Sequence, residues 1–150
     1  MVLRELNPAT DALLLFRWRC DPVTVKSSFS GDIPTWDNHL RWLLKQDPQR
    51  TFIACVQGDA VGCVRFTPDL DRGFEVHIVV APEHRGQGYG AEMLRCALEI
   101  LPKDVGRVAG YIRAENEASR RTFTKAGFKE TYVVAEWERP RGALGDLTLA

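Results

Sequence analysis

The chain has 150 residues, of which 45% are apolar and 27% charged, and its 20 basic and 20 acidic residues cancel to a formal net charge of zero. This length and composition predict a single globular domain spanning residues 1–150. The balanced charge argues against nucleic acid as the main partner, because phosphate-backbone binding needs clustered Lys and Arg. The sequence shows neither a signal-peptide hydrophobic region nor an apolar run of about 20 residues, so no membrane association is expected and a cytoplasmic location is predicted.

The hydrophobic pattern predicts strands and helices along the whole chain. In chain order, strands are expected at residues 2–6, 51–57, 60–66, 73–80, 107–113, 131–138 and 146–149, and helices at residues 11–19, 36–46, 87–101 and 116–127. Gly58 and Asp59 are expected to form a hairpin turn, and residues 22–34 an irregular connection. Central hairpins followed by alternating helices and strands predict an α/β fold, with a mixed, mostly antiparallel sheet of six to seven strands and helices on both faces.

Three glycines, Gly86, Gly88 and Gly90, lie between the β-branched strand at residues 73–80 and an amphipathic helix. Glycine lets the backbone adopt positive φ and approach a ligand closely. The first turn of a helix presents N–H groups that have no partner in the chain, and together with the helix dipole they attract anions. Arg85, directly before the turn, can add a charge-assisted contact. The segment therefore predicts an anion site.

The spacing of these glycines excludes two common nucleotide-binding turns. A dinucleotide-binding turn has G-x-G-x-x-G directly after a first strand, whereas this chain has G-x-G-x-G in its middle. A phosphate-binding loop would continue with a lysine, and none follows here. Taken alone, the segment is also compatible with a surface turn that serves only tight packing of strand and helix.

A wider comparison of the motif points to one family. Arg85-x-x-Gly88-x-Gly90 resembles the R/Q-x-x-G-x-G/A signature of the GNAT superfamily of N-acetyltransferases, and residues 78–86 resemble the strand and bulge that precede it there. A second motif of that family, N-x-x-[A/S]-x-x-x-Y-x-K-x-G-F, is similar to a later segment of this chain. The residues that carry this second similarity are Asn116, Ser119, Phe123, Lys125, Gly127 and Phe128. The resemblance implies a GNAT-like fold and an enzyme that uses acetyl-CoA.

The resemblance also implies which residues contact acetyl-CoA. In the family two parallel strands splay apart and the pantetheine arm lies between them, while the glycine turn holds the pyrophosphate. The residues thereby implied in cofactor binding are Ile78, Val79 and Val80 through their backbone groups, Arg85, Gly86, Gln87, Gly88, Tyr89 and Gly90 at the pyrophosphate, and Asn116, Ser119 and Phe123 from the second motif. No metal site is expected.

The transfer needs a base, because the acceptor amine is mostly protonated at pH 7. Glu75 and His77 lie on one face of their predicted strand, since strand side chains alternate, and either is a candidate catalytic base. The alternative is that Glu75 pairs with a neighbouring strand and His77 only packs. The family's usual proton donor is a tyrosine where this chain has Phe123. Tyr132, Ser119 or water would then protonate the thiolate, or it leaves unprotonated.

Acceptor specificity in the family comes from the first two helices and their connection. The segments around Trp18 and Trp42 resemble a subgroup that acetylates amino groups on nucleotide-linked sugars, although the tryptophans can equally anchor the two helices to the sheet. Asp21, Ser28 and His39 are the predicted substrate contacts. The predicted acceptor is thus a small-molecule primary amine, of which a nucleotide-linked amino sugar is one.

Two other functions stay open at this point. A protein N-terminus or lysine would be the acceptor if the groove were open enough for a peptide. A non-catalytic acyl-CoA-binding module is the second alternative, which the replacement of the usual tyrosine by Phe123 favours. Dimers are common in the family, so a homodimer is compatible with the resemblance.

Overall fold

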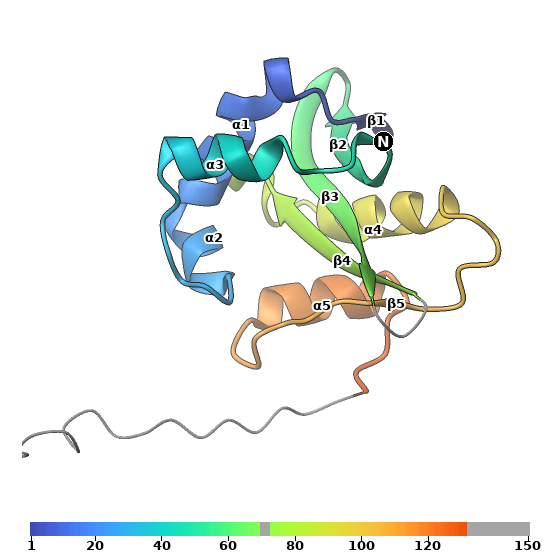
Figure 1. Cartoon of the computed structure of the whole chain (residues 1–150). Coiled ribbons are helices and arrows are strands. Elements are labelled where there is room, and N and C mark those ends of the chain that lie inside the picture. Colours follow the sequence, from blue (N-terminus) through green and yellow to red (C-terminus); the bar gives the residue numbers. More distant parts are fainter. Residues whose placement is uncertain (70–72, 132–150) are drawn as a thin grey trace, which may run out of the picture.

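The computed structural model describes residues 1–69 and 73–131, which form a five-stranded sheet covered by helices (Figure 1). The elements in chain order are β1 (Val2–Glu5), α1 (Pro8–Cys20), α2 (Pro22–Ser27), α3 (Trp36–Leu43), η1 (Pro48–Arg50), β2 (Thr51–Val56), β3 (Asp59–Asp69), β4 (Gly73–Val80), η2 (Pro82–His84), α4 (Tyr89–Glu99), β5 (Val108–Ala109) and α5 (Glu117–Lys125). Within the described residues, no helix is long and apolar enough to cross a membrane.

The sheet has the order β1-β2-β3-β4-β5. The pairs from β1 to β4 are antiparallel, and β5 joins β4 in parallel. The predicted mixed, mostly antiparallel sheet is thus confirmed, but its size is corrected from six to seven strands to five within the described residues. Thr131 lies in no strand. The rest of the strand predicted at 131–138, and the strand predicted at 146–149, lie outside the described residues.

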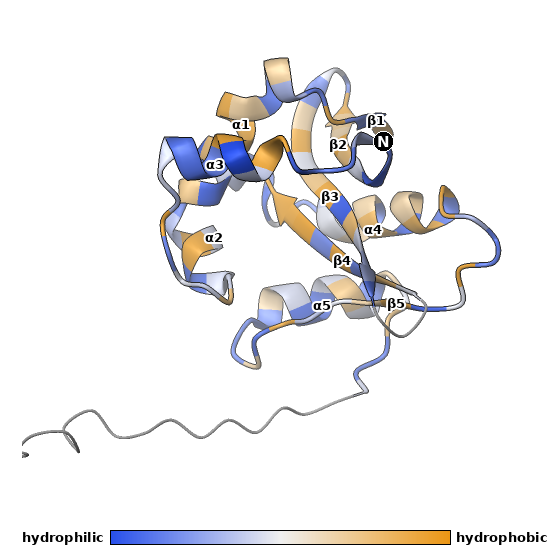
Figure 2. Ribbon diagram, viewed as in Figure 1, coloured by the Kyte–Doolittle hydropathy of each residue, from blue (hydrophilic) through white to orange (hydrophobic). Residues whose placement is uncertain are grey.

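Two hydrophobic clusters lie on the two faces of the sheet, because successive strand residues point to opposite sides. Val76 and Leu94 belong to the cluster that α4 and α5 form with one face. Leu15, Leu43 and Ile53 belong to the cluster that α1 and α3 form with the other. Figure 2 shows the strongly hydrophobic end of β4, which runs between these layers. Glu75 and His77 alternate with Val76, so they point toward the α1–α3 side.

Several predicted element boundaries differ from the structure. Residues 22–34 were expected to be irregular, but α2 begins there because Asp21 caps it and Pro22 occupies its first turn. The hairpin turn is formed by Gln57 and Gly58, whose φ angles of 52° and 92° suit the twist of a tight hairpin, rather than by Gly58 and Asp59.

An ion pair joins β1 to the start of α1. The Arg4 guanidinium donates to both carboxylate oxygens of Asp11 at 2.8 and 2.7 Å, and the backbone N–H of Asn7 donates to Oδ2 of Asp11 at 2.9 Å. Asp11 is only 2% exposed, so its charge needs these partners. Burial raises the pKa of Asp11, but the bonds from Arg4 and Asn7 outweigh it, so the pKa lies below its usual range. The pair therefore fixes α1 against the sheet.

Candidate functional site

The glycine turn begins α4 without any side-chain cap. Gly88 is the N-cap at φ 84°, and Gly86 has φ 77°, a left-handed conformation that glycine adopts without strain. Among the described residues, no hydrogen-bond acceptor is recorded for the backbone N–H groups of Gly88, Tyr89 and Gly90. A Cβ on Gly86 or Gly88 would meet nothing within 4 Å. The turn therefore presents free donors to open space, as an anion site requires.

Gly90 has a different reason to be glycine. A Cβ there would lie 2.9 Å from Cγ2 of Thr122 and 3.3 Å from Cγ2 of Val80. The start of α4 can therefore pack against α5 and the end of β4 only without a side chain. Gln87 is exposed, and its side chain donates to the carbonyl of Glu83 at 3.4 Å. The lack of a side chain at Gly90 thus allows α4 to pack closely, and this packing sets the direction of the free N–H groups at its start.

The Arg85 side chain is engaged within the protein. Its guanidinium donates to Oδ2 of Asp21 at 2.6 Å and to Oγ1 of Thr24 at 2.9 Å. Asp21 also accepts from the backbone N–H of Thr24 at 3.0 Å, and Arg85 holds the pKa of Asp21 below its usual range. Arg85, which was predicted to contact the pyrophosphate, therefore binds Asp21, which was predicted to contact the acceptor. This pair joins the glycine turn to α2.

The strands β4 and β5 separate soon after they meet. They pair only at Phe74 with Val108 and at Glu75 with Ala109. The N–H of Phe74 donates toward β5, to the carbonyl of Arg107 at 3.0 Å. Because peptide groups alternate along a strand, those of Ile78 and Val80 also point to this edge, where no described strand covers them. Val79 points to β3 instead, where it pairs with Cys63. The two strands therefore separate after Glu75 and Ala109, as the family resemblance implied.

The second motif begins α5, which follows β5 in the chain. Asn116 caps the helix, and its Oδ1 accepts from the backbone N–H of Ser119 at 3.1 Å. Asn116 also lines a pocket of about 180 Å³ between α2 and the segment after β5. The other residues that line this pocket are Lys26, Ser27, Arg113 and Glu115. Asn116 is therefore positioned next to an opening, whereas the backbone of Ser119 completes the cap.

Phe123 lies in the core. Its side chain is 6% exposed, and its ring packs edge-on against Phe128 with centroids 5.0 Å apart. The ring also covers Gly110, where a Cβ would lie within 2.7 Å of Cζ of Phe123. The aromatic residue at the family's tyrosine position thus holds α5 against the segment after β5.

Glu75 and His77 share one wall of the α1–α3 side. Nε2 of His77 lies 3.0 Å from Oγ1 of Thr67 and 3.4 Å from Oε1 of Glu75. Burial, helped by the charge of Arg65, lowers the pKa of His77 to about 4, so His77 is neutral at pH 7 and its contact with Glu75 is not an ion pair. Burial raises the pKa of Glu75, and Arg65 partly offsets this. A partly buried carboxylate with a raised pKa is suited to accept a proton.

The other two predicted acceptor contacts are engaged within the protein, as Asp21 is. Ser28 ends α2, and its hydroxyl donates to the carbonyl of Val25 at 3.0 Å. His39 is 0% exposed, so its prediction as a substrate contact conflicts with its burial. Its Nε2 lies 2.8 Å from the carbonyl of Ala12, and its Nδ1 lies 3.1 Å from NH1 of Arg19. Because a carbonyl only accepts, Nε2 carries the hydrogen and Nδ1 accepts from Arg19.

The structure reveals charged residues that the sequence did not single out. Arg65 pairs with His77 across β3 and β4, so both point to the same face. Arg113 donates to the carbonyls of Ser28 and Phe29 at 3.0 and 3.1 Å, which ties the segment after β5 to the end of α2. Arg65 could have been singled out from the sequence, because it is a charged residue inside an apolar strand and a buried charge needs a partner or a function.

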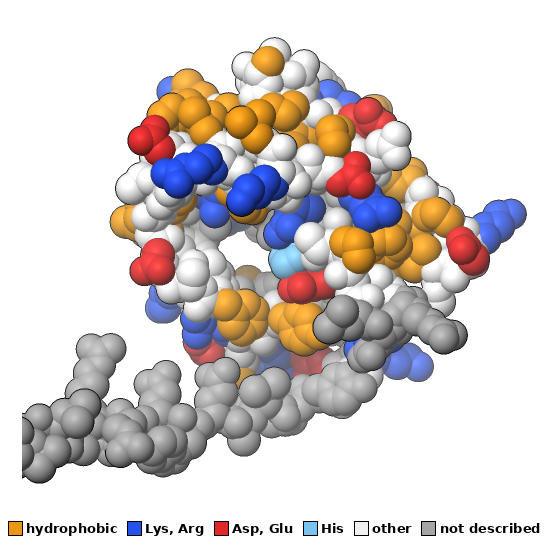
Figure 3. All heavy atoms as spheres, viewed as in Figure 1, with side chains coloured by type: hydrophobic (Ala, Val, Ile, Leu, Met, Phe, Trp, Pro, Cys, Tyr) orange, Lys and Arg blue, Asp and Glu red, His pale blue; other side chains and the backbone are white. Residues whose placement is uncertain are grey.

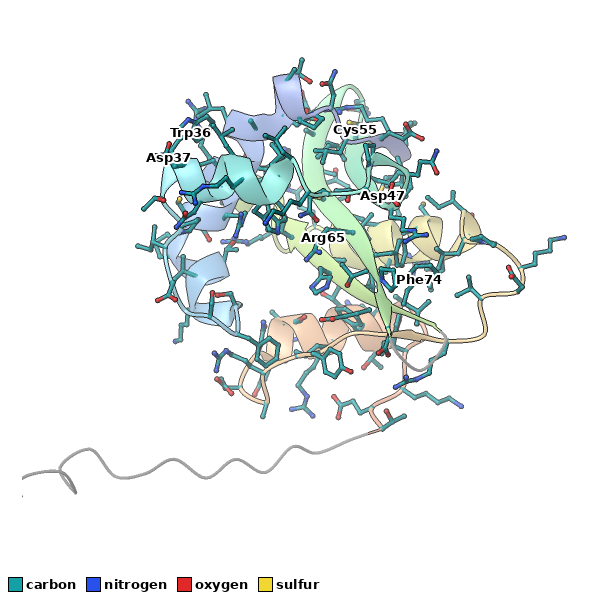
Figure 4. All side chains as sticks on the ribbon, in the orientation of Figure 1. Trp36, Asp37, Asp47, Cys55, Arg65 and Phe74 are labelled. Atoms are coloured by element: carbon teal, nitrogen blue, oxygen red, sulfur yellow. The ribbon has the colours of Figure 1, made fainter. Side chains whose placement is uncertain are left out.

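One face of the molecule is hollowed. Figure 3 shows the hollow in the middle of this face, with basic side chains along its upper rim, a histidine next to an acidic side chain on its wall, and hydrophobic side chains below. Figure 4 shows Arg65 on β3 in the centre of the same view. We use the name acceptor hollow, after the role proposed below, for Arg65 and three side chains near it: His77 lies opposite Arg65 across β3 and β4, Glu75 contacts His77, and Arg19 lies against the same Trp42 ring as Arg65.

The comparisons with known proteins identify the class. The family model for the acetyltransferase (GNAT) domain matches residues 1–129. The chain therefore belongs to the GNAT family of acetyltransferases, which confirms the resemblance found in the two motifs.

Two curated relatives carry related names. An uncharacterised N-acetyltransferase of Methanocaldococcus jannaschii is 29% identical over 109 residues, which make up 67% of this chain and 48% of that protein. An uncharacterised N-acetyltransferase of Archaeoglobus fulgidus is 32% identical over 94 residues, or 57% of this chain and 64% of that protein. The chain thus spans about half to two thirds of the length of these relatives.

Solved structures share the fold. An aminoglycoside acetyltransferase in complex with coenzyme A has a TM-score of 0.74 at 19% identity, covering 89% of this chain and 86% of that one. Spermidine N-acetyltransferase from Vibrio cholerae, in complex with CoA and spermine, has a TM-score of 0.73 at 21% identity, covering 91% and 86%. Ribosomal-protein-alanine N-acetyltransferase from Brucella melitensis has a TM-score of 0.71 at 22% identity, covering 88% and 86%. At these identities the likeness shows the fold alone.

Proposed function

We propose that this protein transfers the acetyl group of acetyl-CoA directly to a primary amine. The observation that carries the proposal is the position of the free N–H groups of Gly88, Tyr89 and Gly90, which lie at one end of the gap between β4 and β5. Such a row of donors at a helix N-terminus fits a pyrophosphate. The open edge of β4, at Ile78 and Val80, fits the amide groups of a pantetheine arm. Acetyl-CoA supplies the activated acyl group.

The chain's own groups then serve the acceptor amine. Glu75 accepts the proton that the ammonium must lose before its nitrogen can attack the carbonyl carbon. A free backbone N–H on the open edge of β4, at Ile78 or Val80, donates to the carbonyl oxygen as negative charge develops there. The carbon–nitrogen bond forms, the carbon–sulfur bond breaks, and the electron pair leaves with sulfur. His77, neutral and 3.4 Å from Glu75, positions that carboxylate.

In the family motif a tyrosine can protonate the departing thiolate, but this chain has Phe123 at that position of α5. Phe123 has no hydroxyl, and its ring is buried against Gly110. A thiolate is a moderately good leaving group, so the reaction proceeds without a donor there or with water in that role.

The acceptor that we propose is an amino sugar linked to a nucleotide, as the resemblance of the first helices suggested. The solved structures with this fold include complexes with kanamycin and with spermine, so the fold by itself selects no acceptor. Transfer to a protein N-terminus or lysine, and acyl-CoA binding without catalysis, are the outcomes that a direct test separates from it.

The test combines binding and turnover. Acetyl-CoA at 100 times its Kd should stabilise the protein by about 2.7 kcal/mol, which raises the Tm by roughly 5–10 °C for a chain of this size. Thiol release should then be measured with UDP-amino sugars, aminoglycosides, polyamines and peptides. No Tm shift at millimolar acetyl-CoA would contradict cofactor binding. A shift without thiol release from any amine would identify a non-catalytic module.

A further inference from the structure

Two arginines of the acceptor hollow lack a carboxylate partner. Arg65 and Arg19 are both half-buried, and neither forms a salt bridge within residues 1–69 and 73–131. The donors of Arg19 reach the neutral ring of His39, and no hydrogen bond of the Arg65 side chain is recorded among those residues. By contrast, Arg4 and Arg85 are each held by an aspartate. Burial lowers the pKa of Arg65 and the nearby charge of Glu75 partly offsets this, but Glu75 forms no ion pair with either arginine, so two guanidinium groups face one carboxylate among the described residues of the hollow.

Both guanidinium groups lie against one tryptophan. The Cζ atom of Arg19 is 4.1 Å from the ring centroid of Trp42, and that of Arg65 is 5.6 Å away. A cation–π contact contributes about 0.5–2 kcal/mol, which does not replace the hydrogen bonds that five N–H donors need. Burial lowers the pKa of both arginines, and Arg65 further lowers that of Arg19 by repulsion. The arrangement is costly unless an anion from outside completes it.

The position of Arg65 relates this charge to the reaction. Arg65 lies directly opposite His77 on the neighbouring strand, and Glu75 is two residues along from His77 on the same face. Oε1 of Glu75 lies 3.4 Å from Nε2 of His77, and the charge of Glu75 acts against the lowering of the pKa of Arg65 by burial, so the three side chains are neighbours. A ligand whose amine meets Glu75 would therefore bring another part of the same molecule to the Arg65 guanidinium.

We propose that Arg65 and Arg19 form a subsite for an anionic group of the acceptor, so that the substrate is an amine that also carries a phosphate or carboxylate. This inference rests on the proposed acetyl transfer, and it narrows the acceptor class. Amino sugars with a phosphate or diphosphate belong to the class. Polyamines and aminoglycosides do not, because their positive charges would face two half-buried arginines without an intervening anion.

Matched acceptor pairs test the proposal in the wild-type protein. Glucosamine 6-phosphate is compared with glucosamine for the phosphate source, and 5-aminopentanoate with its amide for the carboxylate source, with spermidine as the polycation. A charge-assisted contact should raise kcat/KM for at least one anionic member about tenfold or more over its neutral partner. Equal rates within both pairs, or spermidine as the best acceptor, would overturn the proposal.

Variants assign the preference to the subsite. Arg65→Gln should reduce the anionic-to-neutral ratio of kcat/KM to below about threefold, while Arg65→Lys, which keeps the charge but not the planar fork, should retain part of it. Arg41→Gln removes an exposed arginine of α3 and should leave the ratio as in wild type. An undiminished ratio in Arg65→Gln would overturn the role of Arg65, and Arg19→Gln supplies the second test if Arg65→Gln does not fold.

A binding measurement separates this inference from the proposed reaction. Calorimetric titration of the same ligand pairs into the CoA-saturated wild-type protein reads the anion preference without turnover. Tighter binding of an anionic member with no thiol release would contradict acetyl transfer but support the subsite. Thiol release with no preference in binding or rate would support the transfer and contradict the subsite.

Discussion

The glycine turn and the acceptor hollow are built from different parts of the chain. At the glycine turn, the donors are backbone N–H groups of residues 88–90, which are consecutive in sequence. At the acceptor hollow, the groups are the side chains of Glu75, Arg65 and Arg19, which come from β4, β3 and α1. A backbone site depends on local conformation, whereas a side-chain site depends on how distant elements pack. The first is therefore easier to recognise in a sequence than the second.

The arginines of the molecule also fall into two groups, which differ in how their charge is compensated. Arg85 and Arg4 are paired with buried or partly buried aspartates and hold helices in place. Arg65 and Arg19 are half-buried next to Trp42 without such partners among the described residues. Paired arginines thus serve the fold, and the unpaired ones mark the part of the surface where we expect a ligand.

The largest effect is expected at the glycine turn. Gly88→Glu places a side chain and a negative charge in the open space beside the free amides, and it imposes a non-glycine residue at φ 84°. We expect acetyl-CoA binding to weaken by at least about 100-fold, because both like charge and bulk oppose the pyrophosphate. Calorimetric titration with acetyl-CoA measures this.

Gly58→Glu is the matched control. Gly58 also has a positive φ, 92°, and open space around its Cβ position, but it lies in the β2–β3 hairpin. It should carry the same backbone strain and leave acetyl-CoA affinity unchanged. Retained affinity in Gly88→Glu would show that the glycine turn is not the pyrophosphate site.

The next effect is expected at Glu75 in the acceptor hollow. Removing the proposed base with Glu75→Gln should lower kcat by about 10²–10⁴-fold, with little change in affinity for acetyl-CoA. The wild-type rate should fall as the pH drops through the raised pKa of Glu75, and this acid limb should be absent in the variant. Initial rates from pH 5 to about 9 test both statements. A wild-type pH profile in Glu75→Gln would assign the base elsewhere.

The same substitution should act on stability in the opposite direction. The pKa of Glu75 is higher in the folded than in the unfolded chain, so its favourable contribution is complete below the unfolded pKa and is lost as pH rises through the folded value. At pH 7 Glu75→Gln should therefore unfold at the same or a higher urea concentration than wild type. A clear loss of stability would indicate that Glu75 serves the fold.

The smallest functional effect is expected at His39. His39→Phe removes the donor to the buried carbonyl of Ala12 and the acceptor for Arg19, which should cost about 1–3 kcal/mol in the free energy of unfolding. Urea denaturation measures this loss, and kcat for a neutral amine should stay within about threefold of wild type. A raised acceptor KM with unchanged stability would instead support His39 as a substrate contact.

The local sequence predicted several elements well because short-range signals specify them. The strand at residues 73–80 was predicted with the observed bounds, and the helix expected at 87–101 begins at Tyr89, after the glycine that caps it. The strand expected at 107–113 is reduced to Val108–Ala109, because β5 leaves β4 after two pairs. Its β-branched and apolar residues fit a strand, but a strand forms only where a partner edge is available.

The sequence by itself determined the family, the glycine turn and the residues facing each side of β4, because motif spacing and strand alternation are local properties. Only the tertiary structure decided that Arg85 holds Asp21, that His39 is buried, and that Arg65 and Arg19 converge on Trp42. The physical reason is that a charged or polar side chain has its role fixed by the partners it meets. Those partners lie on elements that only folding brings together.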